Sequence, residues 1–187
     1  MRYLFYDDET QGSKHRICQV GAILCDQDLR ECDTISTLVN PECDFDPYVV
    51  NNIHHIDADI CADAPIFPDV FRTAIWPALS SDGVLVAHNA RGADLHHIAK
   101  SLLAYGIKMP PIRVIDTLDM ARSLGGVPLK LAALADRYGV PDPSHHDALN
   151  DARILVPVFQ GLVMEGAKPK VRVAHFRPNG RHAFIYK

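Results

Sequence analysis

The stretch RYLFYDDET, residues 2–10, joins an apolar run typical of a buried β-strand to three consecutive acids. Side chains of a strand alternate between its faces, so Asp7 and Glu9 share one face and Asp8 lies on the other. Two carboxylates that close repel each other unless they share a proton or a cation, and hard divalent cations prefer oxygen ligands. The stretch therefore fits half of a Mg²⁺ or Mn²⁺ site, although by itself it favours the plainer alternative of a strand that ends in solvent.

The composition is that of a soluble globular protein of one ordinary domain. The chain has 187 residues, of which 48% are hydrophobic and 22% charged. No apolar run approaches about 18 residues, and the N-terminus lacks the layout of a signal peptide. The five cysteines form no CxxC pair, which favours small buried thiols over a zinc site. Their odd number suits a reducing compartment. We therefore expect a cytoplasmic protein with no membrane partner.

Charge is distributed unevenly along the chain. The net charge is −4, but all 23 acids lie at or before Glu165, whereas six Lys and Arg residues follow it. The first 165 residues thus carry −10 and the remaining residues +6. Such asymmetry indicates a polyanionic partner for the tail, and a solvated basic end explains it equally well.

The order of apolar patterns predicts a mixed sheet. Runs at 15–26 and 31–40 follow the first strand across short links, as in an antiparallel meander. Strands then alternate with helices, which places helices on the faces of one sheet and gives an α/β fold. The expected later strands are 84–88 and 113–117, and the expected helices are 65–79, 94–105, 119–124, 129–139 and one from about Ser144 to Val163, with a kink at Pro157.

The chain ends in a predicted β-hairpin. Residues 171–176 and 182–187 flank Asn179-Gly180, the strongest short hairpin signal. We predict a domain at 1–165, with 166–187 as a basic hairpin extension of that domain. The hairpin either supplies positive charge beside a cleft that binds the polyanionic partner, or simply covers an edge of the sheet or mediates dimerisation.

Further acids and a histidine occur at informative positions. Asp94 begins a helix soon after a buried strand and Asn89, and His146 precedes Asp151 by five residues in HHDALNDAR. Each signal is weak alone, since an Asp that begins a helix is usually a cap. His145 competes with His146, but the residue five positions beyond His145 is Asn150. His88, His96 and His97 are interpreted as supporting or surface groups, because a carboxylate site for a hard cation needs no imidazole.

Taken together, DxE in a first strand, Asp after the Asn of a central strand and HxxxxD in a last helix resemble the DEDD superfamily of 3′-to-5′ exonucleases. The resemblance is to its histidine subclass, which includes bacterial replicative proofreading subunits and RNase T. It covers residues 2–163 and extends to HRICQVGAI, IHHID, DAPIF, VAHNA, VIDTLDMAR and LKLAALADRYGV. It implies an RNase H-like mixed sheet flanked by helices, and it puts Asp8 at the variable position of the family.

The sequence departs from the common pattern of that family at several positions. Asn89 and Asp94 are separated by four residues, as in oligoribonucleases and TREX-type nucleases, and Ala93 stands where Phe is common. Gln11 replaces the usual Thr of a Thr-Gly pair, and His55 replaces Gly. These changes bear on substrate fit more than on chemistry.

The resemblance implies a two-metal hydrolysis. Two Mg²⁺ or Mn²⁺ ions would be held by Asp7, which bridges them, by Glu9 and Asp151 on the nucleophile side, and by Asp94 through water. His146 would take the proton of the attacking water, a role that suits imidazole because it titrates near neutral pH. The terminal nucleotide would be bound by four residues, namely Thr10, Gln11, Gly12 and Asn89.

The leading functional prediction is a 3′-5′ exonuclease that releases nucleoside 5′-monophosphates from single-stranded DNA. It would act in replication proofreading or DNA repair, either alone or with a DNA polymerase subunit. A 3′-5′ exoribonuclease similar to RNase T or oligoribonuclease remains an alternative, because the 2′-hydroxyl is read by the shape of the pocket. A nucleic-acid or polymerase docking module without activity is a third, against which the four acids and His146 argue.

Overall fold

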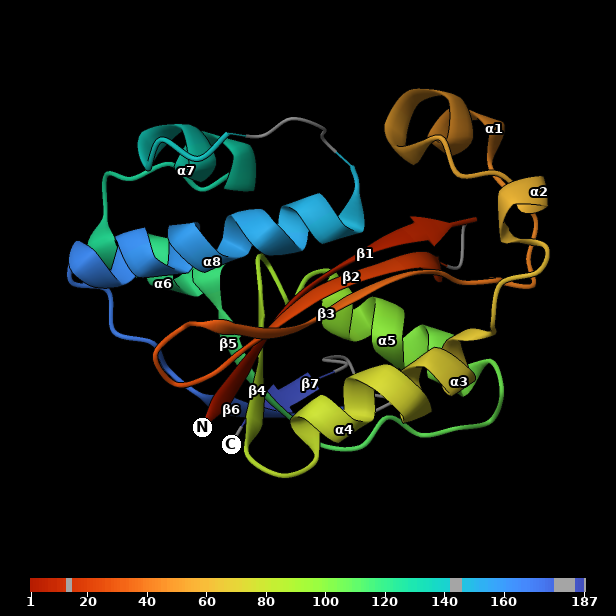
Figure 1. The fold of residues 1–187 in the computed structure, drawn as a ribbon, viewed down its shortest axis with the longest axis horizontal. Coiled ribbons are helices and arrows are strands. Elements are labelled where there is room, and N and C mark those ends of the chain that lie inside the picture. The colour runs from red at the N-terminus through yellow and green to blue at the C-terminus, as the bar shows by residue number, and fades with distance from the viewer. Residues whose placement is uncertain (13–14, 142–145, 177–183, 187) are drawn as a thin grey trace.

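One seven-stranded mixed sheet, in the order β3-β2-β1-β4-β5-β6-β7, organises the chain (Figure 1). The structure is a computed structural model that describes residues 1–12, 15–141, 146–176 and 184–186. β1 to β3 form the predicted antiparallel meander, β4 and β5 run parallel to β1, and β6 and β7 are antiparallel to their neighbours. The strands are β1 Arg2–Gln11, β2 Arg16–Cys25, β3 Glu31–Leu38, β4 Gly83–Ala87, β5 Ile112–Asp116, β6 Arg172–Phe176 and β7 Phe184–Tyr186.

Helices cover both faces of this sheet (Figure 1). One layer contains α3 to α5 and the other contains α6 to α8. The short helices α1 and α2 lie near one end of β1. Within the described residues, each helix is too short or too polar to cross a bilayer. The helices are α1 Pro47–Val49, η1 Val50–His54, α2 Ala58–Cys61, α3 Phe67–Val70, η2 Phe71–Ile75, α4 Trp76–Leu79, α5 Asp94–Leu103, α6 Thr117–Leu124, α7 Leu131–Arg137 and α8 Ala148–Met164, of which η1 and η2 are π-helical.

The alternation of β1 explains why it is a central strand. Leu4 and Tyr6 pack into the core beneath α3 to α5, and Phe5 packs into the opposite core beneath α6 to α8. All three are fully buried, and β4 beside it is buried along its whole length. A strand that is apolar on both faces needs cover on both sides, so the two helical layers follow from the sequence of β1 and β4.

Two predicted helices differ in detail from the structure. The run 65–79 is divided into α3, η2 and α4, and Pro77, which lacks a backbone N–H, lies in its last part. The last helix begins at Ala148 and not near Ser144, because the carboxylate of Asp147 caps it by accepting from the backbone N–H of Asn150 at 3.0 Å. Ser144 itself lies outside the described residues.

The C-terminal segment extends the sheet. β6 pairs with β5, and β7 pairs with β6 in the antiparallel sense of the predicted hairpin. The expected turn at Asn179-Gly180 lies outside the described residues. The division into a domain at 1–165 and an extension at 166–187 stays a prediction.

Candidate active site

Three of the predicted acids meet at one end of β1. Asp7, Glu9 and Asp151 each offer a carboxylate oxygen, and these oxygens lie within 4.8 Å of one another. Asp7 and Glu9 come from β1, and Asp151 comes from the first turn of α8. Residues from the two ends of the chain thus form one cluster that could hold a cation.

A glycine on β2 lets α8 approach this cluster. Gly21 lies opposite Asp7 in the β1–β2 ladder. A Cβ atom built on Gly21 would overlap the backbone of Ala148 and Leu149, so the first turn of α8 rests directly on the backbone of β2. The side chain of any larger residue would push the helix, and Asp151 with it, away from β1.

A glutamine on the same strand fixes the start of α8. Gln19 pairs with Glu9 in the ladder. Its side chain donates to Asp147 Oδ2 at 3.3 Å and accepts from the backbone N–H of Ala148 at 3.1 Å. Sequence reasoning missed both Gln19 and Gly21, although a glycine within an apolar strand is a signal of close approach by another backbone.

The fourth predicted acid is buried without a complete set of partners. Asp94 begins α5 and is 3% exposed, and its Oδ2 atom has no hydrogen bond to any residue that the structure describes. A buried carboxylate oxygen without a partner costs free energy. Burial raises the pKa of Asp94, and the charge of Asp8 raises it further.

The acids also act on one another through their charges. Burial raises the pKa of Asp7, followed by the charges of Asp94, Asp8 and Asp151. Burial likewise raises the pKa of Glu9 to about 8, with Asp151 as the largest of the charges that contribute. The cluster would therefore bind protons at neutral pH unless a cation replaced them. Carboxylates in this number, including one unpaired oxygen, fit a hard divalent cation.

The repulsion among these buried acids predicts that the stability of the folded protein depends on pH. An acid whose pKa is raised by folding favours the folded state at low pH, and this stability is lost as pH rises through the folded pKa. In EDTA, we expect Glu9→Gln to be more stable than the wild type at pH 8.5, and this difference to be about 4 kcal/mol larger than at pH 5. Urea unfolding at several pH values measures it.

A matched control and a metal titration complete that test. Glu31→Gln, at an exposed position of β3, should show no such trend. Mg²⁺ or Mn²⁺ should raise the melting temperature of the wild type, because a ligand that binds only the folded state stabilises it, and the rise should be smaller for Glu9→Gln. A stability difference that stays constant with pH would contradict the proposed origin of the Glu9 shift.

The predicted catalytic histidine lies beside the acids. Nδ1 of His146 is 4.0 Å from Glu9 Oε1, and its side chain is 53% exposed. His146 directly precedes Asp147, the residue that caps α8. The start of α8 therefore places His146 near β1 together with Asp151. Its competitor His145 lies outside the described residues.

Asp8, the remaining acid of the opening stretch, lies on the opposite face of β1 from Asp7 and Glu9. The side chain of Asp8 is fully buried, and it accepts from the hydroxyl of Tyr6 at 2.9 Å and contacts Nδ1 of His97 at 2.6 Å. His88 bridges Thr117 Oγ1 at 3.0 Å and the carbonyl of Leu129 at 2.8 Å. His97 therefore supports β1, which carries Asp7 and Glu9, whereas His88 connects the end of β4 to the first residue of α6 and to Leu129.

The residues predicted to bind the nucleotide have different environments. Gln11 has 0% exposure, donates to the carbonyl of Ile56 at 3.3 Å and accepts from the N–H of Asp46 at 3.1 Å. A side chain without accessible surface cannot contact a nucleotide, so Gln11 anchors the adjoining loop instead. Thr10 and Gly12 flank it and are partly exposed.

Asn89 is exposed on the loop between β4 and α5. Its backbone N–H donates to Asp116 Oδ1 at 2.9 Å, and its side chain packs so closely over Gly92 that a Cβ atom there would overlap it. The loop thus has a compact, pinned conformation just before Asp94.

A sheet of this order, with carboxylates that meet at the end of its central strand, is typical of nucleases of the DEDD class. Residues 4–159 match the family model described as exonuclease, of the RNase T type. The chain therefore belongs to the RNase T family of exonucleases, which are phosphodiester hydrolases.

Among curated proteins, the chain is 30% identical over 176 residues to DNA polymerase III subunit epsilon of Treponema pallidum, covering 87% of this chain and 77% of the relative. It is also 30% identical over 165 residues to the PolC-type DNA polymerase III of Clostridium perfringens, covering 84% of this chain. The chain spans only 11% of the length of that PolC-type relative.

Solved structures show the same fold. Exonuclease X in complex with 5′-overhanging duplex DNA is 25% identical with a TM-score of 0.69, over 89% of this chain and 93% of that one. A 3′-exonuclease that recognises the histone mRNA stem-loop has a TM-score of 0.79 at 15% identity, over 100% of this chain and 90% of that one. The predicted mixed sheet with flanking helices is thereby confirmed.

Proposed function

We propose that this protein is a metal-dependent 3′-5′ exonuclease that removes nucleoside 5′-monophosphates from single-stranded DNA. The observation that carries the proposal is the cluster of Asp7, Glu9 and Asp151, whose oxygens lie within 4.8 Å of one another. The unpaired, buried oxygen of Asp94 supports it. DNA is favoured over RNA because the epsilon subunit is named as part of a DNA polymerase and Exonuclease X was solved with DNA.

In the proposed reaction, Asp7, Glu9, Asp94 and Asp151 hold two Mg²⁺ or Mn²⁺ ions. Such ions stabilise the attacking and the leaving oxygen of an in-line displacement at phosphorus. His146 accepts the proton of the attacking water, and its exposure lets it return that proton to solvent. The bond from phosphorus to the 3′-oxygen breaks, the shortened strand keeps a 3′-hydroxyl, and the phosphate leaves on the 5′-oxygen of the released nucleoside.

The proposal also assigns the terminal nucleotide to the neighbourhood of Thr10, Gly12 and Asn89. Thr10 and Gly12 follow Glu9 directly, and Asn89 lies on the loop that leads to Asp94. Gln11 contributes by holding the segment 46–56, which contains α1 and η1, next to them. Because the relatives include a polymerase subunit and a polymerase, we include a DNA polymerase as a candidate partner.

A gel assay tests this function. 5′-labelled single-stranded DNA and RNA of one sequence are incubated with Mn²⁺ or with EDTA. We expect a ladder that shortens from the 3′ end, that requires the metal and that forms faster on DNA. His146→Ala should slow it by about 10²- to 10⁴-fold, whereas His175→Ala on β6 should not.

Each outcome of that assay has a clear meaning. A faster ladder on RNA would replace the proposed substrate by RNA. Intact bands in all lanes, from wild-type protein shown to be folded, would contradict the activity of the isolated chain and favour the docking module or a required partner.

A further inference from the structure

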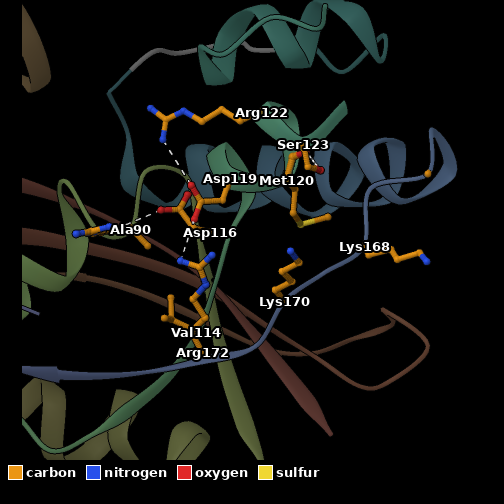
Figure 2. A pocket seen from close by; sticks show the side chains of 12 residues that line it. Ala90, Val114, Asp116, Asp119, Met120, Arg122, Ser123, Lys168, Lys170 and Arg172 are labelled. Carbon is orange, nitrogen blue, oxygen red and sulfur yellow. Dashed lines mark hydrogen bonds and ion pairs between the residues drawn. The ribbon is translucent and has the colours of Figure 1, made fainter. Parts of the chain in front are cut away.

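A cavity of about 610 Å³ opens between β5, α6 and the segment that leads into β6 (Figure 2). We call it the basic pocket, because five cationic side chains and two carboxylates line it, a net charge of +3 in a chain whose total is −4. Its charged residues are Arg91, Arg122, Lys168, Lys170, Arg172, Asp116 and Asp119. None of them was among the predicted site residues.

Both carboxylates of the basic pocket already have partners. Asp119 pairs with Arg122 and with Arg172, each at 3.5 Å, and Figure 2 shows the two guanidinium groups reaching it from different sides. Asp116 accepts from the backbone N–H groups of Asn89 at 2.9 Å and Leu118 at 3.0 Å. The acids therefore hold the walls of the cavity together and leave its lysines uncompensated.

Lys168 and Lys170 carry two of the three surplus positive charges. Both are exposed, and neither has an ion pair or a hydrogen bond with any residue in the described part of the chain. They alternate with Pro169 and continue at Arg172, so three cations occur at every second position of the segment that enters β6. A row of charges matches successive phosphates of a strand better than it matches one small anion.

The basic pocket adjoins the candidate active site through the loop between β4 and α5. Ala90 and Arg91 line the pocket, and Asp94, the fourth predicted acid, lies three residues beyond Arg91. Asp116 ends β5 and pins this loop, and β5 is separated from β1 by β4 alone. Lys168 and Lys170 precede β6, the next strand after β5, and three strand spacings amount to about 14 Å, which is within reach of a strand whose 3′ end occupies the acids.

We propose that the basic pocket binds backbone phosphates of the substrate strand upstream of its 3′ end. This inference rests on the proposed function for the direction of the strand. It assigns the enzyme to substrates longer than a few nucleotides, because only these place phosphates at the acidic cluster and at Lys168 and Lys170 together. A free phosphate ion could use the same cations, so the experiment separates the two ligands.

The test compares Lys168→Ala/Lys170→Ala with a matched control, Lys108→Ala/Lys130→Ala, which removes two exposed lysines outside the pocket. Fluorescence anisotropy measures the binding of a labelled 12-nucleotide single strand in EDTA at several salt concentrations. We expect the pocket variant to bind about 5- to 10-fold more weakly at 100 mM salt, and the slope of log K against log salt to decrease by about 1 to 2. The control should bind like the wild type.

A second measurement separates the pocket from the chemistry. Hydrolysis of the p-nitrophenyl ester of thymidine 5′-monophosphate, which has no upstream phosphate, should be the same in the pocket variant and the wild type. On the 12-nucleotide strand, kcat/KM should fall about 5- to 10-fold, in line with the loss of binding. If the wild type hydrolyses neither substrate, the proposed function fails, and the binding measurement still decides the inference about the pocket.

Three results would overturn the inference. The first is unchanged affinity and salt slope of the pocket variant for the 12-nucleotide strand. The second is an equal loss of turnover on the small ester and on the strand, which would mean that the lysines act on catalysis or on the fold. The third is weaker binding of inorganic phosphate, measured by calorimetry, with undiminished binding of the strand, which would make the cavity a small-anion site.

Discussion

Asp7→Asn should reduce hydrolysis at 3′ ends by about 10³-fold or more, equivalent to roughly 4 kcal/mol of transition-state stabilisation, while the protein stays folded. The reason lies in the position of Asp7 among the acids. Its pKa is raised by burial and by the charges of Asp94, Asp8 and Asp151, so acids from β1, α5 and α8 all act on this one carboxyl group. Asparagine keeps its shape and removes the charge that every proposed cation would share.

The same substitution should have an opposite effect on stability without metal. Because Asp7 is repelled by its neighbours, its replacement by a neutral amide should leave the melting temperature in EDTA unchanged or higher. The increase on addition of Mg²⁺ should be lost or strongly reduced. Steady-state hydrolysis of a labelled single strand and thermal unfolding with and without Mg²⁺ measure the two effects.

Asp33→Asn provides the control for this experiment, since Asp33 is an exposed acid of β3. It should keep both the turnover and the response to Mg²⁺ of the wild type. Retained turnover in Asp7→Asn would contradict the proposed metal site and would favour a nucleic-acid docking function. Loss of folding in EDTA would show that Asp7 has a structural role that its repulsive surroundings do not predict.

The sequence alone predicts the parts of this site that depend on local periodicity. The alternation of Phe5, Asp7 and Glu9 along one face of β1 requires only the period of a strand. The apolar run of β4 predicts a buried neighbour, after which Asp94 begins a helix. The pattern of the last helix places Asp151 near the start of that helix, although the predicted start near Ser144 put Asp151 one turn further along the helix than the structure does.

Other parts of the site depend on how distant segments of the chain pair. The periodicity of the sequence carries no information about that pairing. The β1–β2 register shifts between Glu9 and Thr10, and this irregularity decides which residues of β2 stand opposite the acids. Only that register identifies Gln19 and Gly21 as the residues on which α8 rests. The burial of Gln11 also depends on distant pairing, because the segment 46–56 must fold back over the end of β1.

Gly21→Ala is therefore expected to have the largest effect on stability of the substitutions considered outside the acids. The added Cβ atom would overlap backbone atoms of Ala148 and Leu149, which cannot move aside without shifting the first turn of α8. We expect a loss of about 3 kcal/mol in the free energy of unfolding, as for other overpacked positions. Displacement of Asp151 by about 1 Å should also lower turnover by about 10²-fold.

Gly106→Ala separates this clash from a general loss of stability. Gly106 has a φ of +71° and no neighbour near the position of its Cβ, so alanine should cost about 1 kcal/mol through backbone strain alone. Its turnover and its response to Mg²⁺ should match the wild type. Urea unfolding with and without Mg²⁺ and hydrolysis of a labelled strand compare the two variants.

The decisive quantity is the stabilisation by Mg²⁺ in each variant. If α8 brings Asp151 to the acids only because β2 has no side chain at Gly21, Gly21→Ala should lose most of that stabilisation even under conditions where it is fully folded. A Gly21→Ala protein that is destabilised but keeps the full response to Mg²⁺ would mean that α8 can lift from β2 without separating Asp151 from Asp7 and Glu9. Binding of the cation would then depend on the acids of β1 and α5 more than on Asp151 of α8.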